Sequence, residues 1–199
     1  VIIHPTILTD DGKRMSKSKG TGIDPLGLLD TYGADATRFA MSRLVTTSQD
    51  MRFGTNISKT KGEEGQRFMT KFFNAARFVL MSLDGTDKAG ALAGAASLAN
   101  GDAIPGHAFE DRWILSRLNT TIRTVDAALQ RYEFGEAAAQ MYAFAWFEYC
   151  DWYIEASKAT LQGTDAVRKA NTLAVIDFVL GHTLRLFHPF LPFITEELW

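Results

Sequence analysis

Hydrophobic side chains recur at helical spacing along most of the chain that follows residue 63. Over residues 63–83 they return every three or four positions, which predicts an amphipathic helix with one broad apolar face. That face is expected to hold Phe68, Met69, Phe72, Phe73, Ala76, Val79, Leu80 and Leu83. The same spacing predicts long helices over about 110–132, 134–161 and 165–187. Short turns between the later helices favour an antiparallel helical bundle, so we expect a mainly α-helical fold.

The first part of the chain has a shorter and more varied pattern, which predicts a small mixed α/β unit. An apolar run at residues 1–3 and an alternating segment at 49–53 are each typical of a short strand. We therefore expect two domains, the mixed unit over residues 1–56 and the helical domain over residues 57–199. Residues 84–106 are rich in Gly and Ala without a strong apolar stripe, and we expect them to form a long connection.

Two short helices inside the mixed unit are predicted from their end signals. Asp24 is a good N-cap, and Pro25 fits the first helical position because an N–H there would have no helical partner. Gly33 follows the last turn of this helix and suits the positive φ found at many helix ends. Asp35 is then expected to cap the second short helix.

Composition and charge narrow the class of protein. Hydrophobic residues make up 46% and charged residues 22% of the 199 residues, which is enough apolar material to bury a core. The net charge of −2 excludes a generally basic nucleic-acid binder, so any nucleic-acid contact must come from a local patch. The single cysteine, Cys150, excludes an intrachain disulfide and a multi-cysteine zinc site, and is typical of a reducing, cytoplasmic location.

The two ends of the sequence favour a piece of a longer protein. The chain begins inside an apolar run and stops at Trp199, directly after residues typical of a helix start. The apolar run from Val1 to Ile3 is too short for a secretory signal or a membrane span, so neither is expected.

A basic loop that contains two serines is the most specific chemical feature of the sequence. Residues 13–20 carry four cations and two hydroxyls without apolar periodicity, and Gly12 and Gly20 are expected to act as hinges. Such a loop can fold over a polyphosphate, with the ammonium groups of Lys17 and Lys19 on the phosphoryl oxygens. The loop lacks the glycine-rich cradle of a P-loop. The alternative is a solvated basic turn that binds nothing.

The stretch Arg14-Met15-Ser16-Lys17-Ser18 resembles the KMSKS motif of class I aminoacyl-tRNA synthetases. Only the first position departs, since Arg14 keeps the charge of a lysine but not its compact ammonium group. Ile23-Asp24-Pro25 and Tyr32-Gly33-Ala34-Asp35 resemble the segment that joins the catalytic and anticodon-binding domains in the subgroup for valine, isoleucine, leucine and methionine. Within that subgroup the valine-specific enzymes are the most similar, on the stretches 49–53, 71–80, 111–117, 150–155 and 188–199. The last stretch is shared with the isoleucine and leucine enzymes.

The resemblance implies a reaction and a set of contacts with its substrates. The whole enzyme would activate valine with ATP and Mg2+, and would then transfer valine to tRNA(Val). Lys17 would be the catalytic residue, because the second lysine of the motif steadies the phosphates as pyrophosphate leaves. The ATP-binding residues would be Arg14, Met15, Ser16, Lys17 and Ser18.

The same resemblance also indicates which activities and bound groups the isolated chain should not have. Nothing in it matches the His-Ile-Gly-His element of the family, so the isolated chain is expected to be inactive. No metal site and no tightly bound cofactor are expected. The expected partners are ATP, tRNA(Val) and the rest of the synthetase chain, with no membrane and no DNA.

A second stripe on the predicted helix 63–83 combines cations, an amide and an aromatic ring. Its members recur at steps of four, three and four, with one further cation at the border: Arg67, Lys71, Asn74, Phe78 and Arg77. We interpret the stripe as tRNA-binding, with an unpaired base on the Phe78 ring, a base edge at Asn74 and the cations near phosphates. The alternative for Phe78 is packing against a neighbouring segment.

Aromatic residues surround much of the predicted helix 134–161, too widely to form only a ligand site. We expect most of them in the core, with Trp152 or Tyr153 reaching a surface; the set is Phe144, Trp146, Phe147, Tyr149, Trp152 and Tyr153. Cys150 lies among them and is interpreted as a small buried apolar residue rather than a nucleophile. Glu148 and Asp151 are expected to pair with Arg or Lys on a neighbouring helix.

Three other functions remain open from the sequence. The chain could belong to an isoleucine, leucine or methionine enzyme, because the pocket that reads the amino acid lies outside it. It could also be an RNA-binding module without catalysis, or a helical scaffold for protein interactions in which the basic loop has no role.

Overall fold

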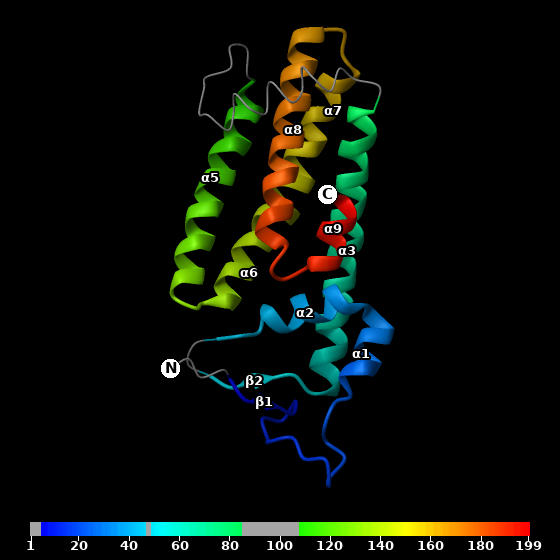
Figure 1. The fold of residues 1–199 in the computed structure, drawn as a ribbon, viewed down its shortest axis with the longest axis vertical. Helices are drawn as coiled ribbons and strands as arrows, with labels where there is room; N and C mark the ends of the chain where they lie inside the picture. The colour runs from blue at the N-terminus through cyan, green and yellow to red at the C-terminus, as the bar shows by residue number, and fades with distance from the viewer. Residues whose placement is uncertain (1–4, 47–48, 85–107) are drawn as a thin grey trace.

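A computed structural model of the chain describes residues 5–46, 49–84 and 108–199. Long helices dominate these ranges, and a small two-stranded sheet lies at one end (Figure 1). In chain order the elements are β1 (Ile7–Leu8), α1 (Pro25–Tyr32), α2 (Ala34–Ser42), β2 (Met51–Arg52), α3 (Thr55–Leu83), α5 (Phe109–Gln130), α6 (Phe134–Ala143), η1 (Phe144–Tyr153), α7 (Ile154–Gln162), α8 (Ala166–Phe187) and α9 (Pro192–Leu198). The segment η1 is π-helical and joins α6 directly to α7.

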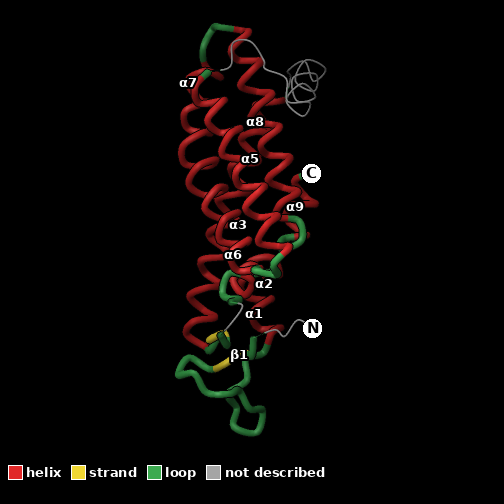
Figure 2. Tube along the Cα trace, turned by 90° about the vertical axis from the view of Figure 1, so that its left-hand side faces the viewer, coloured by secondary structure: helices red, strands yellow, loops and turns green. Residues whose placement is uncertain are grey.

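The helices α3, α5, α7 and α8 run along the long axis of the molecule in both views (Figures 1 and 2). α5 and α6 meet at the end near α2, whereas α7 and α8 meet at the opposite end (Figure 1). The helices α1 and α2 pack against the lower part of α3, the small sheet lies near the start of α3, and the basic loop extends further away from the long helices (Figures 1 and 2). None of the helices in the described ranges is long and apolar enough to cross a membrane.

Most of the predicted elements are confirmed, within a few residues at their ends. The three later helices predicted from apolar spacing are α5, the continuous α6–η1–α7 segment and α8. The strand predicted within 49–53 is β2, which pairs in parallel with β1, so that Ile7 lies opposite Met51. The strand predicted at residues 1–3 lies outside the described residues, as does all of the connection predicted over residues 84–106 except Asp84, which is the C-cap of α3.

The start of α3 differs from the prediction, because the helix begins at Thr55 and not near residue 63. Gly54 at the N-cap offers no side chain, and the carboxylate of Asp10 takes its place. Asp10 accepts hydrogen bonds from the backbone nitrogens of Asn56 at 2.9 Å and Ile57 at 3.1 Å. These N–H groups have no partner within the helix, so the carboxylate satisfies their hydrogen-bonding capacity. Its negative charge also interacts favourably with the positive end of the helix dipole. The cap comes from a distant turn, which no local pattern can reveal.

The ends of α1 are confirmed, whereas the role of Asp35 is not. The Asp24 carboxylate accepts a hydrogen bond from the Leu26 nitrogen at 3.0 Å, and Gly33 has φ 86°. Gly33 is also the N-cap of α2, which places Asp35 inside the first turn of that helix. The prediction that Asp35 caps α2 is therefore wrong. Its carboxylate is buried and accepts backbone N–H groups of α9 instead.

Replacing Gly33 with alanine is expected to reduce the free energy of unfolding by about 1–3 kcal/mol. The cost comes from the backbone alone, because φ 86° with ψ 160° suits only glycine and a Cβ would meet no atom within 4 Å. Gly27 inside α1 is the matched control, where alanine should gain about 0.5–1 kcal/mol through lower chain entropy. Equilibrium urea unfolding measures both changes. A Gly33 variant as stable as the unmodified chain would contradict the predicted backbone strain at this position.

The core is built around an aromatic cluster that joins the mixed unit to the long helices. The Phe68 ring of α3 lies 5.0 Å from Phe39 of α2, 5.8 Å from Phe72 and 5.4 Å from Phe187 of α8, between ring centroids. All four side chains are fully or almost fully buried. Such aromatic contacts add to the apolar area that each ring removes from water.

The inner face of α3 is narrower than the sequence predicts. Phe68, Phe72, Ala76 and Val79 are completely buried. Phe73 and Leu80, which were predicted on the same face, remain 41% and 46% exposed. They lie at the edges of the apolar arc, beyond the surface that the neighbouring helices cover.

Buried polar groups near η1 find partners, as their burial requires. The Tyr149 hydroxyl donates to the Ile176 carbonyl at 2.9 Å, and the Tyr153 hydroxyl donates to the buried Asp111 carboxylate at 2.7 Å. Burial raises the pKa of the Cys150 thiol to about 12. The thiol therefore stays protonated near neutral pH, as expected for an apolar role and not for a nucleophile.

Candidate functional site

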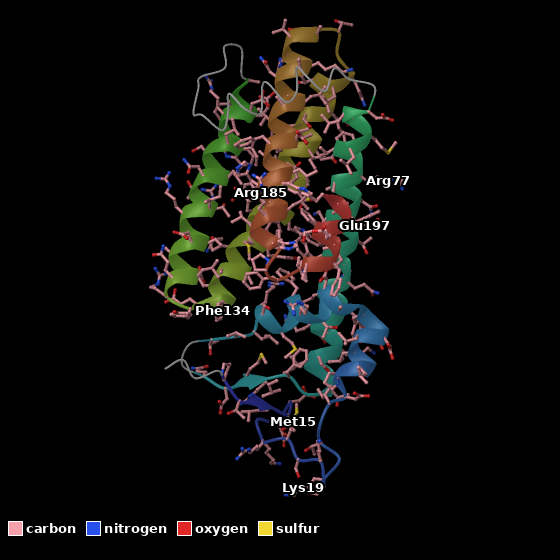
Figure 3. The ribbon with its side chains drawn as sticks, viewed as in Figure 1. Met15, Lys19, Arg77, Phe134, Arg185 and Glu197 are labelled. Atoms are coloured by element: carbon pink, nitrogen blue, oxygen red, sulfur yellow. The ribbon has the colours of Figure 1, made fainter. Side chains whose placement is uncertain are left out.

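The basic loop lies at the end of the molecule that is farthest from α7, with Lys19 at its tip and Met15 nearer the small sheet (Figure 3). Its two predicted hinges have the positive φ that glycine allows, 80° at Gly12 and 63° at Gly20. A backbone bridge between Leu8 and Arg14 holds one side of the loop to β1. The sequence and the structure thus agree on a short loop with a glycine of positive φ at each end, and the action of these glycines as hinges stays a prediction.

Hydrogen bonds close the motif into a tight turn. The Ser16 nitrogen donates to the Thr21 hydroxyl at 2.9 Å, and the Thr21 nitrogen donates to the Ser16 carbonyl at 3.2 Å. The Gly20 nitrogen donates to the Lys17 carbonyl at 3.1 Å, and the hydroxyls of Ser16 and Ser18 lie 2.9 Å apart. These bonds present two hydroxyls and the Lys17 ammonium group from one short turn.

The charges of the loop are divided between a paired and an unpaired set. Lys13 forms an ion pair with Asp11 at 2.7 Å, and the hydrogen bonds from Lys13 and Thr9 lower the pKa of Asp11 to about 2. Lys17 and Lys19 are exposed, and neither forms an ion pair with any of the described residues. Their ammonium groups are therefore available to an anionic ligand.

The predicted RNA-binding stripe is partly brought together on α3. An open hollow on the helix is lined by Gln66, Arg67, Thr70, Lys71 and Asn74, and it includes three of the five predicted residues. Arg67 and Asn74 are exposed, so their donors reach solvent. Lys71 is half-buried, and its ammonium group lies 3.9 Å from the centre of the Trp146 ring. We call this surface the α3 hollow.

The π-helical segment supplies the neighbours of Lys71. Trp146 and Asp151 lie five positions apart, which corresponds to one i→i+5 turn, and both contact the Lys71 ammonium group. A second ion pair joins Glu148 to the Arg117 guanidinium of α5 through two hydrogen bonds of 2.7 and 2.8 Å. The predicted pairing of Glu148 and Asp151 with cations on neighbouring helices is confirmed.

Phe78 and Arg77 do not line the α3 hollow. Phe78 is half-buried, packs against the core cluster and lies 5.6 Å from the Lys158 ammonium group of α7. Arg77 is exposed on the outer side of α3 (Figure 3). The packing alternative therefore describes Phe78 better than a free stacking platform. The core cluster and Lys158 of α7 lie far from Phe78 in the sequence, so sequence reasoning could not place them beside it.

The aromatic run of the π-helical segment is divided between core and surface. Phe144, Tyr149 and Tyr153 are buried, as most of the run was predicted to be. Trp152 is 71% exposed and Phe147 is 52% exposed. Within the described ranges no group of three or more His, Cys, Asp or Glu side chains could hold a metal ion.

Two family models match the chain, one at each end. Residues 1–54 match the tRNA synthetases class I model for I, L, M and V, and residues 111–199 match the anticodon-binding domain of tRNA ligase. The basic loop lies in the first match, and the second match covers α5 from its third residue through α9. The chain belongs to the class I tRNA synthetases of this group.

Within this group the chain is similar to the valine–tRNA ligases. It is 44% identical to the enzyme of Bacillus licheniformis and 43% identical to that of Bacillus subtilis, over 100% of its own length. It spans 21% of the length of each of these relatives.

Two solved structures share the fold. One is a LeuRS of Agrobacterium radiobacter in a ternary complex with tRNA and LeuAMS, with a TM-score of 0.71 and 21% identity over 98% of this chain and 22% of that one. The other is a methionyl-tRNA synthetase of Mycobacterium tuberculosis in complex with methionyl-adenylate, with a TM-score of 0.71 and 19% identity over 98% of this chain and 36% of that one.

Proposed function

We propose that the chain supplies the ATP loop and the anticodon-binding helices of a cytoplasmic valine–tRNA ligase. In this proposal residues 1–56 form the end of the catalytic region, and residues 57–199 form an antiparallel helical bundle that binds the anticodon arm. The observation that carries the proposal is the Arg14–Ser18 motif on a hinged loop with an exposed, unpaired Lys17. The full-length protein would form valyl-adenylate from valine and ATP, and would then transfer valine to tRNA(Val).

The loop acts on the triphosphate of ATP, which enters as its Mg2+ complex. Lys17 places a positive charge where the departing pyrophosphate gains negative charge, and Ser16 and Ser18 offer further donors. Arg14 and Met15 complete the contact, with Arg14 fixed near β1 by its backbone bridge to Leu8. Because Lys17 makes no ion pair among the described residues, no internal bond must break before it meets phosphate.

The α3 hollow is the proposed contact with the RNA. Arg67 provides a charge for a phosphate, and Asn74 provides an amide that can read the edge of an unpaired base. Lys71 adds a second charge, although its pair with Asp151 reduces the net attraction. Arg77 lies outside the hollow on the same helix and adds positive charge for the RNA backbone. Phe78 contributes by fixing the position of α3 against the core and not by stacking on a base.

Replacing Arg67 with alanine in the full-length protein is expected to weaken tRNA binding about tenfold at low salt, as the loss of one phosphate contact predicts. The slope of log K against log salt concentration should become shallower by about one unit. Arg123→Ala is the matched control, because Arg123 is an exposed arginine on α5. Filter binding measures both constants, and an Arg67 variant that binds like the Arg123 variant would contradict the assignment of the hollow.

A further inference from the structure

One polar face of α2 holds the corner between α8 and α9. The Arg38 guanidinium donates from Nη2 to the Pro189 carbonyl at 3.2 Å and from Nε to the Phe190 carbonyl at 3.1 Å. These carbonyls lie after the last turn of α8, where no helical N–H follows to bind them. Arg38 thus fixes the corner by two hydrogen bonds from one planar group.

Asp35 holds the other side of the same corner. Its carboxylate accepts hydrogen bonds from the backbone nitrogens of Ile194 at 2.7 Å and Phe193 at 3.5 Å, in the first turn of α9. The N-cap of α9 is Leu191, whose side chain cannot accept these N–H groups. Asp35 is only 7% exposed, so water does not compete strongly for its carboxylate. We call Asp35 and Arg38, one turn apart on α2, the corner clamp.

The corner clamp joins two parts of the chain that are otherwise far apart in sequence. α2 lies within residues 1–54, which match the synthetase model, and the corner lies within residues 111–199, which match the anticodon-binding model. Phe39, the residue next to Arg38, packs its ring 5.9 Å from that of Phe187, the last residue of α8. The side chains of Asp35, Arg38 and Phe39 on α2 therefore all contact the short region between the end of α8 and the start of α9.

We propose that Asp35 and Arg38 are positioning residues that fix the anticodon-binding helices relative to the ATP loop. This inference rests on the proposed function. α1 follows the loop along the chain and packs against α2, so the loop and α2 lie in the same part of the chain. The corner clamp therefore sets where the helical part lies relative to the part that carries the loop. A tRNA that contacts both parts requires a fixed distance between the ATP loop and the anticodon-binding helices. Misplacement of bound groups by about 1 Å can reduce a rate about a hundredfold, even when the chemistry itself is untouched.

The test compares two half-reactions in the full-length protein. Asp35→Asn keeps the size of the side chain but removes its charge and one of its two acceptor oxygens. Only one of the two N–H groups of α9 then keeps an acceptor, so the clamp should loosen. We expect kcat/KM for tRNA in valine transfer to fall about tenfold, following the cost of misplacement. Valine-dependent ATP–pyrophosphate exchange should stay within about twofold, because neither Asp35 nor Arg38 lies on the ATP loop. Asp30→Asn is the matched control, since Asp30 is exposed on α1.

A role in folding alone gives a different result. Loss of folded protein would reduce exchange and transfer by the same factor, and that outcome would overturn the proposal. Arg38→Lys provides a second variant, which keeps the charge and one hydrogen bond but not the fork to two carbonyls. It should show the same split between the half-reactions to a smaller extent, at a temperature where circular dichroism shows both variants folded.

The outcomes also separate this inference from the function on which it rests. A full-length protein that performs neither half-reaction would refute the proposed function. A protein that performs both, while its Asp35→Asn variant transfers valine as well as the control, would refute only the corner clamp.

Discussion

Replacing Lys17 with alanine in the full-length protein is expected to slow valine-dependent ATP–pyrophosphate exchange by about a hundred- to a thousand-fold, the usual cost of one preorganised donor. The Lys17 ammonium group is exposed and unpaired among the described residues, so its charge can act fully on the phosphates. The effect should appear in the rate more than in tRNA binding, because the charge matters as the phosphates redistribute their own.

Lys13→Ala is the matched control for this prediction. Lys13 lies at the start of the same loop, but its ammonium group already pairs with Asp11. Its loss should change the exchange rate by less than about threefold, as expected for an exposed ion pair. If the Lys17 variant also exchanges within about threefold of the unmodified protein, Lys17 has no role on the phosphates.

Replacing Phe68 with alanine is expected to reduce the free energy of unfolding by about 3–5 kcal/mol, the usual cost of deleting a buried aromatic ring. Phe68 is completely buried and contacts aromatic rings from α2, α3 and α8. Its loss would leave a cavity where the mixed unit meets the long helices. Equilibrium urea unfolding of the chain measures the change.

Phe73→Ala on the same helix makes the comparison specific. Phe73 is 41% exposed, so its truncation should cost no more than about 1 kcal/mol. Both residues share the apolar pattern in the sequence, and only the structure separates them. Equal decreases in the free energy of unfolding for the two variants would contradict the assignment of Phe68 to the core and of Phe73 to the surface.

The features that the sequence predicts well are those set by neighbouring residues. Apolar spacing locates α5, α8 and the α6–η1–α7 segment, because burial of one face determines where these helices form. Asp24 and Gly33 mark the ends of α1, because each acts on backbone groups within its own helix. The basic loop and the glycines at its ends are also set locally, and both glycines have the positive φ that only glycine adopts freely.

The features that the sequence misses depend on distant partners. α3 begins early because Asp10 caps it from a separate turn, and α9 begins at Pro192 with Asp35 as its cap. In both cases the local N-cap residue, Gly54 or Leu191, carries no acceptor. A carboxylate that acts across the fold leaves no trace in the spacing around the helix it caps.

The proposed RNA contact shows the same division. Arg67, Lys71 and Asn74 recur on one side of a single helix, so their shared surface follows from helical geometry. The approach of Lys158 of α7 to Phe78 and that of Trp146 to Lys71 depend on a π-helical turn in another segment. That turn shifts every following side chain around the axis, and the α-helical period used for prediction cannot anticipate it.

The most direct test of the account is the amino-acid dependence of tRNA charging by the full-length protein. Purified protein, ATP, Mg2+ and total tRNA are incubated with labelled valine, isoleucine, leucine or methionine in parallel. We expect valine alone to be joined efficiently to tRNA, and tRNA(Val) alone to accept it. Charging with isoleucine, leucine or methionine in place of valine, or no charging with any of the four, would contradict the proposed function.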